Sequence, residues 1–427
     1  MTPSPRRAAT FAAFLAVFLL SACATMTRPA ETDAERAERK RREDQACVDF
    51  FLTTHDRLRE RMVHDAESDK TFDVLILSGG GDFGAFGAGF LLGWGDCTDP
   101  ALKRPEFDFV AGTSTGAILA PLAFIGTDSA LEVGAKLYSD PPPNLVKEPG
   151  LLSLLPWNAA LSDPSGLRKT VHDQLDADFL AELRQGDDEK RILACASTNI
   201  DFGTFRPFNL LLGRNLPDEE YREFLLDRIM ASAAIPGVFP PVLVDGSLFV
   251  DGGVTENAWT LRDQSVDDSA ISQWLRRFPD RPLPKMRLWY LVNNQLFPPG
   301  ETVEPTWINL AGRGLSTSIR SALIKDLLIG SQVARLTNEH LAKVTGGRIS
   351  AEVEFRFVAI PDDFVPPVPG NFKPETMRDL VELGKKMGRD PASWRTEVPH
   401  LDGVGGWKPY EGDLVRPDGS RFVPKQN

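Results

Sequence analysis

The stretch that decides the fold is FDFVAGTSTGAILAPLAF, residues 107–124. It begins with aromatic and β-branched residues typical of a strand and ends in an apolar run typical of a buried helix. Between them lies GTSTG, residues 112–116, a G-x-S-x-G pattern. On a sharp strand-to-helix turn, this pattern raises the serine hydroxyl above the sheet at the positive end of the helix. Ser114 is therefore a candidate nucleophile, although an ordinary Gly-Ser turn would have the same letters.

A similar unit precedes it. Residues 72–77, FDVLIL, form an uninterrupted apolar run that suits a strand buried on both faces of a parallel sheet. Gly79, Gly80 and Gly81 follow, and then a predicted helix, GAFGAGFLLGW. Two successive strand–helix units predict an α/β fold with a mainly parallel sheet.

The glycine loop could serve two kinds of chemistry. Its backbone N–H groups, at the start of a helix, could stabilise the oxyanion of an acyl-transfer reaction. They could also hold a nucleotide phosphate, but the Gly-Lys-Ser/Thr of a P-loop is missing and no convincing ribose-binding acid follows about twenty residues on. Asp82-Phe83-Gly84 matches one kinase triplet, while the other kinase motifs are absent. We therefore favour an oxyanion hole at Gly79–Gly81.

The catalytic base has two candidates. Asp251 follows a predicted hairpin at 242–250, with its turn at Asp245-Gly246, and precedes two glycines. With its ordinary pKa of about 3.9 it would be a poor base, so burial must raise that pKa; its alternative role is to hold the backbone of its own turn. The histidines are His55, His64, His172, His340 and His400. Only His400 is late enough in the chain for a conventional triad.

The N-terminus has the features of an export signal. Arg6 and Arg7 precede ten apolar residues, 11–20, which are too few to span a bilayer. The sequence Leu-Ser-Ala-Cys that ends at Cys23 resembles the lipobox of bacterial lipoproteins. That resemblance implies cleavage before Cys23, acylation of its side chain and, because alanine follows, retention in the outer membrane facing the periplasm. A plain secretory signal with a chance cysteine is the alternative.

The composition of the chain argues against a nucleic-acid-binding protein and against a disulfide-rich fold. The chain has 427 residues, 42% of them hydrophobic, and a net charge of −12, which argues against a nucleic-acid partner. Four cysteines are too few for a disulfide scaffold. In an oxidising compartment a bridge between Cys47 and Cys97 is nevertheless a reasonable hypothesis, whereas Cys195 lies in an apolar run and is expected to be a buried thiol.

We divide the chain into four parts. Residues 1–22 are the signal peptide, 23–70 a charged tether and N-terminal helix, 71–401 one catalytic domain, and 402–427 a polar tail. Further strands are expected at 191–199, 286–293 and 352–360. Further helices are expected at 218–230, within 306–344 and at 374–387.

Four motifs in this order, GGGDFGAFGAG, GTSTG, ASAAIPGVFPPV and DGG, resemble those of the patatin-like phospholipase family. The resemblance covers residues 72–255. It implies a three-layer α/β/α sandwich and a Ser–Asp dyad without histidine, with Ser114 as nucleophile, Asp251 as base and Gly79–Gly81 as oxyanion hole. It also implies a membrane lipid ester as substrate, and no metal or organic cofactor.

One position departs from the family pattern. The glycine loop commonly carries Arg or Lys where this chain has Phe83, and phenylalanine cannot attract an anionic head group. The expected function is therefore a membrane-anchored serine acyl hydrolase that cleaves lipid esters through an acyl-enzyme. The alternative is an inactive lipoprotein that binds lipid or a partner in the same pocket.

Overall fold

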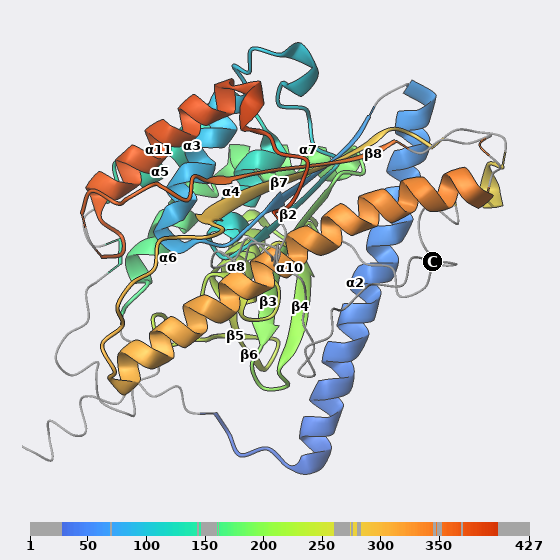
Figure 1. Cartoon of the computed structure of the whole chain (residues 1–427). Coiled ribbons are helices and arrows are strands. Elements are labelled where there is room, and N and C mark those ends of the chain that lie inside the picture. Colours follow the sequence, from blue (N-terminus) through green and yellow to red (C-terminus); the bar gives the residue numbers. More distant parts are fainter. Residues whose placement is uncertain are drawn as a thin grey trace, which may run out of the picture.

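The computed structural model describes residues 28–68, 71–142, 145–146, 160, 162–259, 274, 276–279, 283–344, 347, 352–368 and 370–399. The predicted signal peptide, Cys23, His400 and the tail at 402–427 lie outside these ranges. The described part is built on one sheet with helices on both faces (Figure 1).

The sheet has eight strands in the order β5-β6-β3-β2-β1-β7-β8, with β4 also paired to β3. The strands are β1 (Phe72–Leu77), β2 (Phe109–Thr113), β3 (Ile192–Asn199), β4 (Thr204–Asn209), β5 (Val242–Val244), β6 (Ser247–Asp251), β7 (Met286–Gln295) and β8 (Val353–Ile360). The pairs from β3 through β2, β1 and β7 to β8 are parallel, whereas β4, β5 and β6 are joined by antiparallel pairs. The predicted mainly parallel sheet is confirmed.

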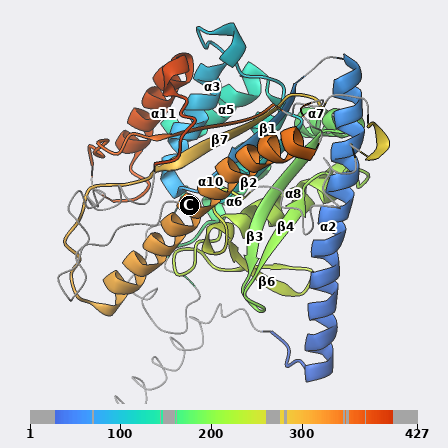
Figure 2. The same ribbon diagram turned by 45° about the vertical axis from the view of Figure 1, so that its right-hand side comes forward.

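Helices cover the sheet in two layers, and each layer has its own core. On one face lie α3 (Gly84–Trp94), α4 (Thr115–Ile125), α5 (Asp128–Ser139), α6 (Ser165–Gln174), α7 (Ala177–Asp188), α8 (Asp218–Ser232) and α11 (Pro374–Arg389). On the other lie the long helices α2 (Asp33–Ser68) and α10 (Trp307–Val344) (Figure 2). Alternate residues of β1 enter the two cores, Leu75 and Leu77 on one side and Val74 and Ile76 on the other. This is the expected α/β sandwich.

The local predictions for the remaining strands and helices are confirmed to within a few residues at each end. The hairpin turn at Asp245-Gly246 is one example: both residues have positive φ, 50° and 85°, as a two-residue turn between antiparallel strands requires. Among the residues that the structure describes, no helix combines the length and apolarity needed to cross a membrane.

The N-terminal charged stretch, expected as a tether and a helix, becomes helical earlier than expected. From Asp33 on it is a single helix, opened by a capping box in which Thr32 and Glu35 exchange hydrogen bonds. Arg39 is buried against the body, where it pairs with Asp201 at 2.8 Å and donates to Ser247 Oγ at 3.1 Å. The tether expected here is therefore, from Asp33 on, a docked helix, because its charges find partners on the sheet's edge.

The predicted disulfide is not formed, and Cys47 and Cys97 are free thiols. Cys97 belongs to the core on the α3 side of the sheet. Cys47 lies on α2, on the opposite side, where Arg206 and Glu256 are among the charges around it. The sheet separates the two residues, so the hypothesis of a Cys47–Cys97 bridge is wrong for this fold. Cys195 is a buried strand thiol as expected, and burial raises its pKa to about 12.

Candidate active site

Ser114 occupies the turn between β2 and α4 in a strained conformation, with φ 55° and ψ −124°. Such backbone angles are costly for a residue with a side chain and persist only where the surroundings enforce them. Backbone atoms crowd both sides of the turn. A Cβ on Gly112 would overlap the carbonyl group of Gly116, and a Cβ on Gly116 would overlap the carbonyl group of Leu77. Glycine on both sides therefore permits the sharp turn that presents Ser114.

Ser232, the last residue of α8, holds this turn in place. Its buried hydroxyl accepts a hydrogen bond from the Ser114 N–H at 2.9 Å and donates one to the Ala196 carbonyl of β3. In the sequence, Ser232 lies within the motif ASAAIPGVFPPV of the family resemblance, and nothing singled it out there. We regard Ser232 as a positioning residue, since its contact is with the nucleophile's backbone.

Replacing Ser232 with alanine is expected to cost about 1–3 kcal/mol of stability, because a buried N–H and a buried carbonyl lose their partner. It is also expected to lower kcat more than it raises KM, because the nucleophile becomes less ordered. Urea unfolding and ester hydrolysis measure the two effects. Ser197→Ala is the matched control, since that buried hydroxyl has no hydrogen-bond partner among the described residues. Equal behaviour of the two variants would contradict the positioning role.

Asp251 ends β6 and is 2% exposed. Its N–H donates to the Ala234 carbonyl at 2.9 Å, and its own carbonyl accepts from Thr198 Oγ1 at 3.0 Å. In the side chain, Oδ1 accepts from the Gly253 N–H at 2.8 Å, while Oδ2 has no hydrogen-bond partner within the described part of the chain. One carboxylate oxygen is thus anchored and the other is available to a proton.

Burial raises the pKa of Asp251 to about 6, and the nearby Ser114 hydroxyl and the hydrogen bond from the Gly253 N–H oppose that rise. Ser114 is therefore close enough to influence the carboxylate, although no hydrogen bond of ordinary length joins it to Oδ2. Catalytic hydrogen bonds are often long before substrate binds. The structure thus brings together the two residues that the sequence places 137 positions apart, and it gives the aspartate the pKa of a usable base.

The glycine loop presents two backbone donors rather than three. The Gly79 N–H already donates to Asn257 Oδ1 at 2.8 Å. The N–H groups of Gly80 and Gly81 have no partner among the described residues, and Gly81 lines the same pocket as Ser114. Of the three candidate donors, Gly80 and Gly81 are the ones available to an oxyanion.

Asparagine side chains hold this loop, although no motif in the sequence points to them. Asn293 Nδ2 donates to the Ser78 carbonyl at 2.7 Å and Asn294 Nδ2 to the Gly79 carbonyl at 2.8 Å. Asn257 is held in turn by the buried Asp326 of α10, whose Oδ2 accepts the N–H of Asn257 at 2.7 Å. The loop conformation is therefore fixed by the ends of β7 and by the segment after Asp251.

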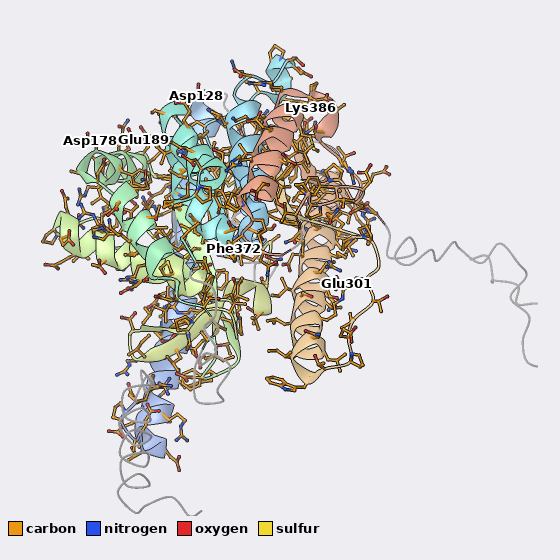
Figure 3. The ribbon with its side chains drawn as sticks, turned by 90° about the vertical axis from the view of Figure 1, so that its left-hand side faces the viewer. Asp128, Asp178, Glu189, Glu301, Phe372 and Lys386 are labelled. Atoms are coloured by element: carbon orange, nitrogen blue, oxygen red, sulfur yellow. The ribbon has the colours of Figure 1, made fainter. Side chains whose placement is uncertain are left out.

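A narrow apolar pocket adjoins Ser114. Almost all of its lining is apolar: Ile118, Leu137, Leu145, Val146, Leu167, Ala233, Ile235, Phe239, Phe372 and Met377. Phe372, labelled in Figure 3, precedes α11. A narrow apolar pocket that opens at a nucleophile suits a hydrocarbon chain attached to the carbonyl under attack.

Phe83 occupies the position where the family commonly has a basic residue, and in the structure it packs against another aromatic side chain. Its ring meets that of Phe364 edge to face at a centroid distance of 6.4 Å. The neighbouring Asp82 is buried and accepts the N–H of Phe372 at 2.7 Å, and burial raises its pKa. The loop is therefore fastened to the segment before α11 by apolar and backbone contacts in place of a cation.

His55, His172 and His340, the histidines whose side chains the structure describes, do not reach this site. None of them lines the Ser114 pocket; His172 lies on α6 beside Glu219 and Glu223, and His340 is exposed near the end of α10. His172, Glu219 and Glu223 could together hold a metal ion, but exposed acidic groups of this kind are common without one. The His400 alternative lies outside the described residues.

The site lies within a segment that matches a known protein family. Residues 75–261 match the patatin-like phospholipase family, a range that contains Gly79–Gly81, Ser114 and Asp251. We call residues 75–261 the patatin-like domain, after the family that they match. The fold predicted from the resemblance is thereby confirmed.

The patatin-like domain is also similar to a curated protein described as a cGAMP-activated phospholipase from Pseudomonas aeruginosa (strain BWHPSA011 / Pa011). The two are 29% identical over 194 residues, which cover 44% of this chain and 54% of that protein. The chain thus spans about half the length of the curated relative that it matches. Among solved structures, VipD from Legionella pneumophila matches at a TM-score of 0.32 and 12% identity, over 77% of this chain and 68% of that one, a likeness too small to support any inference.

Proposed function

We propose that this protein is a serine acyl hydrolase that cleaves lipid ester bonds with Ser114 as nucleophile and Asp251 as general base. One observation carries the proposal. Ser114, on a strained turn, lines an apolar pocket, and the buried carboxylate of Asp251, with a pKa of about 6, lies beside it. The match of residues 75–261 to the patatin-like phospholipase family supports lipid hydrolysis as the activity.

The reaction follows from the positions of these groups. Ser114 Oγ attacks the ester carbonyl carbon while its proton passes to Asp251. The N–H groups of Gly80 and Gly81 donate to the oxyanion of the tetrahedral intermediate, and each such donor is typically worth about 2.7–4 kcal/mol. Asp251 returns the proton to the departing alcohol, which leaves an acyl-enzyme. Water, deprotonated by Asp251, then attacks the acyl carbon, and the fatty acid is released with Ser114 regenerated.

A dyad of this kind predicts a simple dependence on pH. Asp251 acts as base only when ionised, so kcat/KM should fall about tenfold per unit below pH 6 and level off above it. Rates on a soluble short-chain ester from pH 4 to 9 measure this profile. The triad alternative predicts instead that His400→Ala abolishes activity while Asp251→Asn retains it.

A binding protein without catalysis is the second candidate, and Phe83 is the observation that favours it, because the loop lacks the cation common in the family. Fatty acid release distinguishes the two candidates. The protein is incubated with phospholipid that carries different acyl chains at its two positions, and the products are identified by mass spectrometry. A hydrolase releases one or both acids, and their identity gives the ester position. A binding protein releases neither.

We further propose that Cys23 carries a lipid anchor that holds the protein to the outer membrane, facing the periplasm. The supporting features are the two arginines, the apolar run and the Leu-Ser-Ala-Cys sequence. Labelled palmitate should be incorporated into the wild type and not into Cys23→Ala, which should leave the membrane fraction. Equal membrane retention and labelling of the two would contradict the anchor.

A further inference from the structure

The first turns of α10 are unpacked. Trp307 is 79% exposed and Leu310 54%, and Ile308 is exposed beside them. A Cβ added to Gly312 or Gly314 would meet nothing within 4 Å, so these two positions face open space. We call residues 307–315 the α10 tip. In Figures 1 and 2 the tip is the free lower-left end of the orange helix, and in Figure 3 Glu301 is labelled beside α10.

The tip lies at the catalytic edge of the sheet. The loops after parallel strands β1, β2, β7 and β8 emerge at one edge, and Ser114 and the glycine loop occupy it. α10 begins there, shortly after β7, and runs back until Asn338 bonds to the first residue of β8, Val353, at the opposite edge. On the way Ile319 packs against Gly253, two residues from Asp251. Trp307 is twelve residues before Ile319, about 18 Å along the helix axis.

A further apolar residue, in another loop, is exposed at the same edge of the sheet. Val365, in the loop after β8, is 71% exposed, and its neighbour Phe364 packs on Phe83 of the glycine loop. Grouped exposed apolar side chains of this kind are typical of surfaces that meet a protein or a membrane.

The charge of this helix is opposite to that of the whole chain. Residues 307–325 contain Arg313, Arg320 and Lys325 and no acidic residue, although the protein carries a net charge of −12. Glu301, before the helix, pairs with Arg313 at 2.7 Å. Burial, followed by the nearby charge of Arg313, lowers the pKa of Arg320. An apolar helix end with basic residues behind it matches the interior and the anionic surface of a phospholipid leaflet.

We propose that the α10 tip inserts into the surface of a membrane containing anionic phospholipid and so brings the active-site edge to the leaflet. The purpose of this docking, delivery of lipid to the active site, rests on the proposed function. Binding of the α10 tip to a membrane does not depend on it and can be tested separately. Trp307, Ile308 and Leu310 supply the apolar contact, while Arg313 and Arg320 face the head groups.

The test compares full-length variants that all carry Cys23→Ser, so that acylation at that residue cannot hold them to lipid. The tip variant is Trp307→Ser/Ile308→Ser/Leu310→Ser. The matched control is Val333→Ser/Leu336→Ser, which removes exposed apolar side chains from the far half of the same helix. Flotation with vesicles of phosphatidylcholine, with and without phosphatidylglycerol, measures binding. Hydrolysis of a soluble short-chain ester and of vesicle lipid measures activity.

The tip variant should bind phosphatidylglycerol-containing vesicles at least about tenfold more weakly than the control and lose vesicle hydrolysis in proportion. Its rate on the soluble ester should be unchanged. Equal vesicle binding by tip variant and control would overturn the proposal. So would a lower Tm or a changed elution volume of the tip variant, since either would mean that the chain itself or a second copy covers the tip. If the parent protein cleaves no ester but its vesicle binding depends on the tip, the proposed hydrolase function fails and the docking surface stands.

Discussion

Replacing Ser114 with alanine is expected to lower the rate of ester hydrolysis by at least about 10⁴-fold, because no acyl-enzyme can form without the hydroxyl. Alanine has the same backbone preferences as serine, so the strained turn and the Ser232 hydrogen bond to the backbone N–H should persist. Initial rates on a soluble ester, with Tm measured in parallel, test this expectation.

Thr113→Ser is the control for the Ser114 variant. It changes the preceding residue, keeps a hydroxyl at a buried position and should retain most of the activity. Activity in Ser114→Ala close to that of the wild type would exclude Ser114 as the nucleophile. Loss of activity in both variants, with lowered Tm, would indicate damage to the elbow instead.

Replacing Asp251 with asparagine is expected to lower the rate about 10³- to 10⁴-fold at pH 8, since the amide cannot accept the Ser114 proton. Its effect on stability should have the opposite sign. The folded-state pKa of about 6 lies above the ordinary value of about 3.9, so ionisation favours the unfolded chain as pH rises between these values. Asparagine avoids that cost, and its amide oxygen can still accept the Gly253 N–H.

The stability gain of Asp251→Asn should be on the order of 1–3 kcal/mol at pH 8 and near zero at pH 3, where both states of the wild type are protonated. Urea unfolding at the two pH values measures it. Asp245→Asn is the matched control, because Asp245 lies on the same hairpin with an exposed side chain and at a positive φ that asparagine tolerates. An Asp251 variant that is less stable at pH 8 than at pH 3, relative to wild type, would mean that the carboxylate is stabilised by its surroundings and is not a desolvated base.

Local sequence patterns were sufficient to predict the helices and strands and to select Ser114 and Asp251 as the two main candidate residues of the site. An apolar run such as 72–77 or the turn at 112–116 carries its structural information within a few residues. Ser114 and Asp251 could be paired from the sequence because each sits at the end of a strand, next to glycine, in the order that the family resemblance implies. Ser232 lay within the resembling segment, and only its hydroxyl contact with Ser114, 118 residues away, distinguishes it from its alanine neighbours.

The features that the sequence did not predict depend on contacts between segments that are far apart in the chain. The Gly79 N–H is taken by Asn257, 178 residues away, and Asn257 is held by Asp326 on a helix of the opposite layer. Neither residue belongs to a recognisable motif. The charged N-terminal stretch resembled a solvated tether for the same reason: the burial of Arg39 depends on Asp201 and Ser247, which the pattern of residues 24–46 cannot reveal. Sequence spacing likewise suggested a Cys47–Cys97 bridge across what is in fact a sheet.

The central claim is that Ser114 is a nucleophile activated by Asp251, and covalent labelling tests it most directly. Full-length wild type, Ser114→Ala and Asp251→Asn are treated with a fluorophosphonate at pH 8, and the labelled peptide is identified by mass spectrometry. We predict one adduct on Ser114 in the wild type, none in Ser114→Ala and much slower labelling in Asp251→Asn. An unlabelled wild type, or an adduct on another residue, would contradict the account.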